Sequence, residues 1–285
     1  MAVPDRENTI KGSPWKEILL SLPMADILVK HAGTGDHVLV CFHGYLQNRH
    51  FLDPVFGSIP PGWQIVSVDL PCFGGSRWKS PMSMDASFFI SLMENLESVF
   101  TAQHWHFLGF SMGGKMAMAM HLYTKAKEET VILIAPDGIR SNPWHRLIAS
   151  TFPGSFLFEL VSRFPQPFIR IASFLNRKRI LDKISYRVFI RNFGSKQAIK
   201  AFRTYLLVYG QIRFSLKELA KLQAAKPVEW YIIWGREDRV MSPGHAKRLT
   251  KKIPQAQIIV PEGGHMIISD DPFTVRKLLG DILFH

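Results

Sequence analysis

The segment of residues 109–113, G-F-S-M-G, constrains the fold of this chain more than any other part of the sequence. Residues 104–108 before it predict a short buried strand, and residues 112–125 show the spacing of a helix. A G-x-S-x-G motif between a strand and a helix is typical of a sharp turn that exposes a serine hydroxyl above the edge of a sheet. The free N–H groups at the start of the helix favour negative charge there. The pattern predicts that Ser111 attacks a carbonyl group; the alternative is a turn serine that only caps the helix.

Strand and helix patterns alternate through most of the remaining sequence. Apolar runs that predict buried strands of a parallel sheet lie at residues 38–42, 64–68, 105–110, 131–134, 228–234 and 256–260. Segments with helical spacing lie at residues 83–100, 112–125, 243–253 and 272–283. Residues 15–22 and 25–31 predict an antiparallel hairpin ahead of them. The expected fold class is α/β, with a mostly parallel, doubly wound sheet and helices on both of its faces.

A long helical segment interrupts this alternation. Residues 140–226 hold aromatic and aliphatic side chains at helical spacing, with prolines among them and no strand pattern. An insertion of roughly 85 residues is larger than an ordinary loop. The expected domains are therefore a core of residues 1–139 and 227–285 and a helical insertion of residues 140–226.

The positive charge of the chain is concentrated in this insertion. The whole sequence has a formal net charge of +12, with 47% hydrophobic and 20% charged residues, a composition typical of a globular protein. Residues 140–226 contain 17 Lys and Arg against three acidic residues, a net charge of +14, so the rest of the chain carries −2. The charge of this one segment needs its own explanation.

The sequence contains no pattern of export or membrane insertion. Residues 1–16 are polar and lack the apolar centre of a secretory signal, and no run reaches the roughly 18 apolar residues that span a bilayer. Cys41 and Cys72 are too few for a disulfide framework and lie in or beside predicted strands, which favours buried thiols. We expect a cytoplasmic protein.

A serine nucleophile needs a base, and the base needs an acid that orients it. In open α/β sheets such groups gather beyond the carboxyl ends of the strands. Asp238 follows the predicted strand at 228–234, and His265 follows the strand at 256–260. The order Ser111, Asp238, His265 is the order associated with the G-x-S-x-G turn. Glu237, next to Asp238, and Asp137, at the end of an earlier strand, are rival candidates for the acid.

Two backbone N–H groups are candidates for the oxyanion hole that a tetrahedral intermediate requires. The predicted strand at 38–42 runs directly into His43-Gly44-Tyr45, beside the strand that carries the motif. We expect the N–H groups of Tyr45 and Met112 to form the pair. Gly44 allows close approach of the substrate to the backbone, and His43 is expected to brace the loop rather than to react.

Five segments, in this order along the chain, resemble the α/β-hydrolase fold superfamily in its capped serine hydrolase or esterase type: His43-Gly44-Tyr45, residues 69–76, residues 109–113, residues 235–238 and Gly263-Gly264-His265. The resemblance covers about residues 30–285 apart from the insertion. Cys72 stands where the family usually has a glycine, in a turn after a core strand. The resemblance implies a helical cap, or lid, at residues 140–226. It implies the following roles: nucleophile Ser111, acid Asp238, base His265, and oxyanion donors Tyr45 and Met112.

The resemblance also limits the reaction. Relatives that open epoxides or remove halogens carry an aspartate in place of the serine, so Ser111 favours acyl transfer to water. We expect a carboxylesterase-like serine hydrolase that acts on a small acyl substrate through an acyl-enzyme and needs no metal or cofactor. The alternatives are a carbon–carbon bond hydrolase with the same triad, a methyl esterase acting on carrier-protein-linked acyl chains, and a non-catalytic receptor of the same fold.

The basic insertion has two interpretations. Its Lys and Arg side chains either cover apolar surface as ordinary solvated helices or recruit an acidic partner. In the second interpretation one positive face is formed by the run Arg177-Lys178-Arg179 together with three residues at helical spacing, Lys183, Arg187 and Arg191. The partners considered are an acidic carrier protein, a coenzyme A thioester and an anionic membrane surface. Nucleic acid is not expected, because no binding motif accompanies the charge.

Overall fold

The computed structural model describes residues 14–124, 128–137, 152–181, 183–210, 212, 215–240 and 244–284. Contacts divide the chain into two compact units. The first contains residues 1–80, 85–140 and 213–285, and the second contains residues 81–84 and 141–212. All strands found in the described ranges belong to the first unit, and the second unit is helical.

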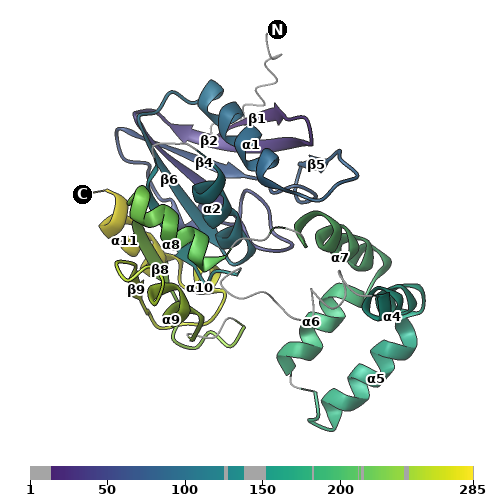
Figure 1. Ribbon diagram of the computed structural model, residues 1–285. Coiled ribbons are helices and arrows are strands. Elements are labelled where there is room, and N and C mark those ends of the chain that lie inside the picture. Colours follow the sequence, from purple (N-terminus) through teal and green to yellow (C-terminus); the bar gives the residue numbers. More distant parts are fainter. Residues whose placement is uncertain are drawn as a thin grey trace. The chain divides into compact units, whose positions relative to one another are not determined.

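The first unit is built around one sheet (Figure 1). Its strands are β1 (Lys16–Ser21), β2 (Ala25–Gly33), β3 (His37–Phe42), β4 (Trp63–Val68), β5 (Arg77–Trp78), β6 (His104–Phe110), β7 (Glu128–Ile134), β8 (Glu229–Ile233) and β9 (Gln257–Ile259). Within the described ranges the order is β1-β2-β4-β3-β6-β7-β8-β9, with β5 paired to β2. Neighbours from β4 to β9 are parallel, and β2 is antiparallel to β1, β4 and β5. The predicted mostly parallel sheet and leading hairpin are confirmed.

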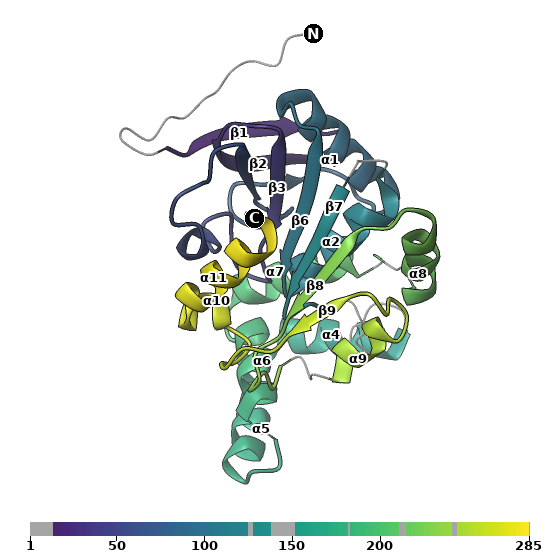
Figure 2. The same ribbon diagram turned by 90° about the vertical axis from the view of Figure 1, so that its left-hand side faces the viewer.

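Helices cover both faces of this sheet (Figure 2). On one face α1 (Ala86–Val99) and α8 (Leu216–Ala225) contact α2 (Met112–Tyr123), and α2 contacts β3, β6 and β7. On the other face α10 (Ile267–Asp270) and α11 (Pro272–Leu283) pack with the short 3-10 helix η1 (Asp53–Val55). α9 (Gly244–Thr250) connects β8 to β9 in the sequence. These layers confirm the predicted doubly wound α/β class.

The central strands are buried on both faces, which explains why their sequences are almost continuously apolar. In β7 the four residues 131–134 are fully buried. On one face Leu39, Leu108 and Ile132 belong to the same apolar cluster as Leu279 of α11. Because β6, β8 and β9 run in the same direction, the residues that follow their carboxyl ends meet at one edge of the sheet.

The second unit consists of α4 (Phe152–Arg163), α5 (Pro165–Arg177), α6 (Lys183–Phe193) and α7 (Lys196–Tyr209), each in contact with the next. Its interior is aromatic. The rings of Phe158, Phe193 and Phe202 lie 5.6 to 5.9 Å apart between centroids. Burial of these rings explains the helical spacing of aromatic residues in the sequence.

The insertion was expected to end at residue 226. In the structure α8 lies before this boundary but groups with the first unit. It contacts α2 and buries Leu219 and Gln223. The Gln223 side chain donates to the carbonyl of Val228 and accepts from Nε1 of Trp230, each at 2.8 Å. These side-chain contacts, which the helical spacing does not reveal, connect α8 to the start of β8.

Three short elements are absent from the sequence-based assignment: β5, η1 and α10. Each is two to four residues long, too short to give a periodic signal. Residues 1–13 and 138–151, on which the expected polar start and the beginning of the insertion fall, lie outside the described residues. In the part of the chain that the structure describes, no helix combines the length and the apolar character required to cross a bilayer.

Candidate active site

Ser111 occupies the turn between β6 and α2, at the carboxyl edge of the sheet. Its φ of 49° and ψ of −114° are unusual for a residue with a side chain. Its N–H donates to the carbonyl of Ile134 at 2.9 Å, and its own carbonyl accepts from Gly114 at 2.9 Å. A Cβ atom at Gly113 would overlap the carbonyl oxygen of Phe42, so glycine is what lets α2 begin so close to β3. The turn is therefore fixed by backbone contacts on both sides.

His265 lies on the loop after β9 and reaches Ser111 at the same edge of the sheet. Nε2 of its ring is 3.2 Å from Oγ of Ser111. The side chain is only 15% exposed, and its ring packs near Phe110 with 5.4 Å between centroids. The imidazole is thus held within hydrogen-bond reach of the hydroxyl and remains accessible at one side.

Asp238 lies on the loop after β8 and is the acid that contacts His265. Its Oδ2 is 2.9 Å from Nδ1 of His265, and its side chain is fully buried. Its other oxygen accepts from the N–H of Val240 at 2.8 Å, which fixes the carboxylate. Of the two rivals, Glu237 is exposed, and Asp137 donates its backbone N–H to the carbonyl of Ser111 at 2.8 Å. The structure therefore brings Ser111, His265 and Asp238 into one hydrogen-bonded row.

The loop after β3 approaches the same turn. A Cβ atom at Gly44 would lie 3.0 Å from the ring of Phe110, and the N–H of Gly44 donates to the side chain of Gln47 at 2.8 Å. Tyr45 is the next residue on this loop, and Met112 is the first residue of α2. The first N–H groups of a helix have no acceptor within the helix. Both predicted oxyanion donors are thus backbone groups on the segments that flank Ser111.

His43 holds the backbone of this loop in place through two hydrogen bonds. Its Nδ1 donates to the carbonyl of Gly44 at 2.7 Å, and its Nε2 accepts from the N–H of Leu70 at 3.0 Å. The ring is 1% exposed, and burial lowers the pKa of His43 from its ordinary value to about 4. It is therefore a neutral imidazole with both nitrogens engaged, in agreement with the expected bracing role.

Asp69 is a second anchor of this loop. The sequence predicts it only as part of a turn. Its fully buried carboxylate accepts from the backbone N–H of Arg49 at 2.6 Å, from Nη1 of Arg49 at 2.7 Å and from the N–H of Gly75 at 2.7 Å. Arg49 also pairs with Glu17 of β1 at 2.5 Å. Glu17, Arg49 and Asp69 lie far apart in the sequence, so no local sequence pattern predicts that they meet.

In the turn of residues 69–76, Cys72 stands where the family usually has a glycine. Cys72 has a φ of 71°, in the left-handed region that a glycine adopts without strain. Its thiol is free, and burial raises the pKa of Cys72 to about 11. Cys41 is also a free, buried thiol. A residue with a side chain in this region carries local strain that a glycine avoids.

The row of hydroxyl, imidazole and carboxylate is suited to proton transfer. With a proton on Nδ1, His265 is placed to donate to Asp238, and its Nε2 is placed to accept a proton from Oγ of Ser111. Side chains suited to a metal ion, His37, His106 and Glu129, gather elsewhere in the first unit. They lie at the amino-terminal ends of their strands, opposite the edge that carries Ser111.

The sequence belongs to the family described as alpha/beta hydrolase fold, whose pattern it matches over residues 37–272. The predicted superfamily is thereby confirmed.

Curated relatives with low identity carry hydrolase names. The chain is 22% identical to an uncharacterized hydrolase, YugF, of Bacillus subtilis, over 87% of this chain and 90% of that protein. It is 23% identical to the human monoacylglycerol lipase ABHD6, with 86% and 74% covered. It is also 23% identical to the pimeloyl-[acyl-carrier protein] methyl ester esterase of Nitrosomonas europaea, with 85% and 93% covered. These relatives support a hydrolase of the alpha/beta family, and two of the three carry esterase or lipase names.

A solved structure supports the fold. A thermophilic esterase from Thermogutta terrifontis superimposes with a TM-score of 0.67 at 18% identity, covering 94% of this chain and 98% of that one. Because identity is this low, the likeness concerns the path of the chain and not its substrate.

Proposed function

We propose that this chain is a serine carboxylesterase that cleaves a small acyl ester through an acyl-enzyme. Ser111 attacks the carbonyl carbon while His265 accepts the hydroxyl proton at Nε2, and Asp238 orients and stabilises the resulting imidazolium. The N–H groups of Tyr45 and Met112 receive the oxyanion. His265 then returns the proton to the leaving alcohol, and a water activated by the same ring releases the acid and frees Ser111.

The observation that carries this proposal is the hydrogen-bonded row of Ser111, His265 and Asp238, with 3.2 Å and 2.9 Å between the bonded atoms. The family membership and the esterase and lipase names among the relatives support the choice of an ester over other substrates. The same row suits the hydrolysis of a carbon–carbon bond, so the choice of substrates must separate the two reactions.

The first prediction concerns the nucleophile. The Ser111→Ala protein is expected to fold normally and to lose at least about 1,000-fold in kcat/KM for p-nitrophenyl esters, because the acyl-enzyme cannot form. Ser98→Ala, on the exposed surface of α1, is the matched control and is expected to keep wild-type activity. The rates are measured spectrophotometrically with C2 to C12 esters and in parallel with β-diketones.

Labelling with a fluorophosphonate probe completes this test. The wild-type protein and the Ser98→Ala control should be labelled, and Ser111→Ala should not. An unlabelled wild-type protein would indicate a receptor that has kept the fold without the reaction. Turnover of β-diketones but not of esters would replace the esterase proposal by a carbon–carbon hydrolase.

We also propose that the second unit binds an anionic membrane surface through α5. Ile171 and Phe174 lie at helical spacing on α5, and Phe164 is the residue that caps its start; all three are more than half exposed. Arg170 and Arg177 are exposed beside this apolar stripe. An exposed apolar stripe with flanking arginines is typical of helices that lie in a lipid interface.

Charge complementarity favours an anionic surface. Residues 141–212 contain 12 Lys and Arg against two acidic residues, so this segment carries +10 of the net charge of +12. Cations also flank the apolar stripe directly: Arg163 lies 5.8 Å from the ring centroid of Phe164, and Lys178 lies 6.0 Å from that of Phe174. An acidic carrier protein would satisfy the charge but leaves the apolar stripe unexplained.

The second prediction tests this surface with vesicles. The wild-type protein is expected to sediment with vesicles that contain 30% phosphatidylserine and not with pure phosphatidylcholine. The pair Arg170→Gln/Arg177→Gln should weaken binding by roughly 10- to 30-fold, since each cation near an anionic leaflet contributes about 1 kcal/mol. Lys251→Gln/Lys252→Gln, an equal charge change on the exposed surface of the first unit, is the matched control.

Two results would contradict the membrane proposal. One is equal weakening by both charge pairs, which would reduce the effect to overall charge. The other is no vesicle binding together with saturable binding of an acyl carrier protein, which would assign the basic surface to that partner.

A further inference from the structure

Four side chains that can bind metal ions gather at the amino-terminal edge of the sheet. The parallel register pairs His37 of β3 with His104 of β6, and Leu39 with His106. Because alternate residues of a strand share a face, His37, His104 and His106 lie on the same face of the sheet. Glu129 joins them from the first residues of β7, the next strand along. The sheet itself brings these residues together from three segments of the chain.

The two imidazole nitrogens that face each other are already at a ligand-to-ligand distance. Nδ1 of His37 is 3.2 Å from Nε2 of His106. Two nitrogens bound to one tetrahedral Zn²⁺, each at about 2.0–2.1 Å, lie roughly 3.3 Å apart. His106 is 4% exposed, and its Nδ1 has no hydrogen-bond partner in the part of the chain that the structure describes. Nδ1 is the other nitrogen of the ring, so the ligand atom that His106 offers beside His37 is Nε2.

A β-bulge directs the carboxylate to this point. The register of β6 and β7 shifts between Trp105 and His106, so that Trp105 pairs with Glu128 and His106 pairs with Thr130. Glu129 is the extra residue between them, and such a residue escapes the strict alternation of a strand. The ligand atoms of Glu129, His37 and His106 all lie within 4.8 Å of one another. Since Glu129 is exposed, its side chain has the freedom to close this distance.

Neighbouring groups hold the ligands in place. The ring of His37 stacks between Trp63, at 4.7 Å, and His104, at 4.5 Å between centroids. His104 Nδ1 is 2.5 Å from an oxygen of Glu129. A hydrogen bond from a second histidine to a ligating carboxylate is the kind of outer contact that orients metal ligands.

We propose that His37, His106 and Glu129 form a Zn²⁺ site with three protein ligands and a water in the fourth position. Imidazole and carboxylate suit Zn²⁺ among the first-row divalent ions. This site is separate from Ser111 and from the proposed esterase reaction. It joins the starts of β3, β6 and β7, so bound Zn²⁺ stabilises the sheet at the edge opposite the candidate active site.

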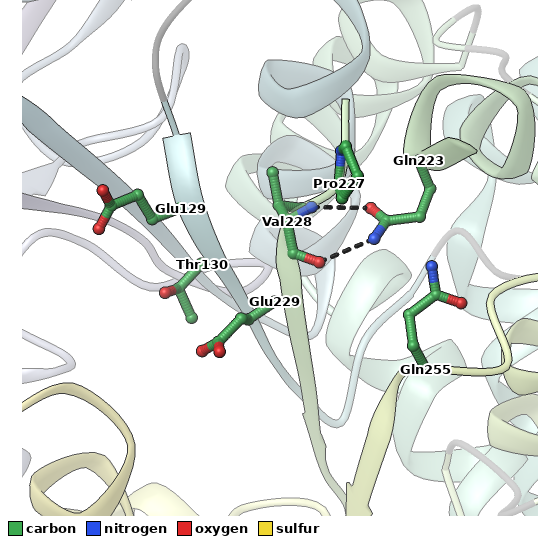
Figure 3. Close-up of a pocket in the computed structure, with 7 residues that line it drawn as sticks. All are labelled: Glu129, Thr130, Gln223, Pro227, Val228, Glu229 and Gln255. Atoms are coloured by element: carbon green, nitrogen blue, oxygen red, sulfur yellow. Dashed lines mark hydrogen bonds between the residues drawn. The ribbon is translucent and has the colours of Figure 1, made fainter. Parts of the chain in front are cut away.

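An open pocket adjoins the carboxylate of the proposed site. Glu129 lines a pocket of about 610 Å³ together with residues at the starts of β7 and β8 and on α8 (Figure 3). In Figure 3 the side chains of Glu129 and Glu229 extend to the same side of the two strands. Two carboxylates at the rim of an open pocket raise the local concentration of cations.

The test measures Zn²⁺ binding to the untagged full-length chain, because a histidine tag would itself bind the ion. Protein stripped with EDTA and dialysed is titrated with ZnCl₂ by calorimetry, and with CoCl₂ by absorption spectroscopy, in which a tetrahedral N/O site gives visible bands. The wild-type protein is expected to bind one ion per chain and to gain several degrees in Tm with saturating Zn²⁺. Glu129→Gln should weaken binding by more than about 10-fold and abolish the gain in Tm.

The choice of variants protects the test against misfolding. Glu129 is exposed, so its substitution leaves the core intact, and His37→Gln provides a second ligand variant. His50→Gln is the matched control, since His50 is an exposed histidine outside the cluster. Loss of binding in both ligand variants, with the control unchanged, supports the proposal. Absence of binding in the wild-type protein, or binding that His37→Gln and Glu129→Gln leave unchanged, overturns it.

Discussion

At the scale of single residues, the candidate active site depends on groups that do not touch the substrate. His43 has both ring nitrogens in hydrogen bonds to the backbone, at Gly44 and Leu70, and therefore connects the loop after β3 to the turn after β4. Tyr45, whose N–H is a proposed oxyanion donor, follows directly. The ring serves this purpose only when it is neutral, because a second ring proton would face the N–H of Leu70.

The third prediction follows from this buried ring. The pKa of His43 is about 4 in the folded chain and about 6.5 when unfolded, so the unfolded state binds more protons between these values. The contribution of the neutral His43 ring to the free energy of unfolding is therefore fully present above pH 6.5 and is lost as the pH falls toward 4. Between pH 6.5 and 4.5 the free energy of unfolding should fall by about 2 kcal/mol more in the wild-type protein than in His43→Gln, which cannot titrate.

Urea unfolding at steps of half a pH unit measures this difference. Glutamine keeps one donor and one acceptor, so the comparison isolates the proton from the loss of hydrogen bonds. If the free energy of unfolding had the same pH dependence in both proteins, His43 would not be a neutral, buried ring.

At the scale of elements, close backbone contacts hold β6, the Ser111 turn and α2 in fixed positions relative to one another. A Cβ atom at Gly109 would overlap the carbonyl of Gly113, and a Cβ atom at Gly113 would overlap that of Phe42. These are backbone atoms, which cannot rotate away as side chains do. The close approach places the start of α2, and with it the N–H of Met112, directly behind Ser111.

The fourth prediction compares two glycines in helices. Gly113→Ala should lower the free energy of unfolding by about 3 kcal/mol and should also reduce kcat by about 100-fold, because α2 and Ser111 must shift. In Gly280→Ala, in α11, the added Cβ meets no atom within 4 Å. This change should raise the free energy of unfolding by about 0.5–1 kcal/mol, since alanine has a higher helix propensity than glycine. Urea denaturation and ester hydrolysis measure both effects.

The opposite sign of the two changes is the informative result. If Gly113→Ala were as stable and active as the wild-type protein, the backbone contact between α2 and β3 would not position the serine.

At the scale of the whole molecule, the sheet separates two kinds of chemistry. β6 begins with His104 and His106 and ends immediately before Ser111. The five steps along the chain from His106 to Ser111 correspond to roughly 17 Å at about 3.3 Å per residue. The proposed Zn²⁺ site and the candidate active site therefore lie at opposite ends of one strand. The positive charge belongs to neither, because it is concentrated in the second unit.

The fifth prediction uses this separation. Removal of metal with EDTA is expected to leave kcat/KM for p-nitrophenyl esters within about twofold, because no ligand of the proposed site lies within hydrogen-bond reach of Ser111. The same treatment should lower the Tm of protein previously loaded with Zn²⁺. Loss of activity that ZnCl₂ restores would show that the two edges are coupled.

The sequence by itself determined the α/β class, the hairpin, the position of the serine turn and the family, because these depend on local patterns. Apolar runs and helical spacing follow from burial of neighbouring residues, and the motif of residues 109–113 brings its own turn. The places of Asp238 and His265 at strand ends were also accessible, since parallel strands gather their carboxyl ends at one edge.

Only the tertiary structure decided which side chains meet. The pairing of His265 with Asp238 rather than Asp137 and the anchoring of Arg49 on Asp69 join residues that are distant in the sequence. The attachment of α8 through Gln223 joins closer residues, but it depends on the side chains of Gln223 and Trp230 meeting in the folded chain. The grouping of His37, His106 and Glu129 depends in addition on the strand register and on one bulge. A register is set by the packing of the whole sheet, and a one-residue shift would separate these groups, so no stretch of sequence records it.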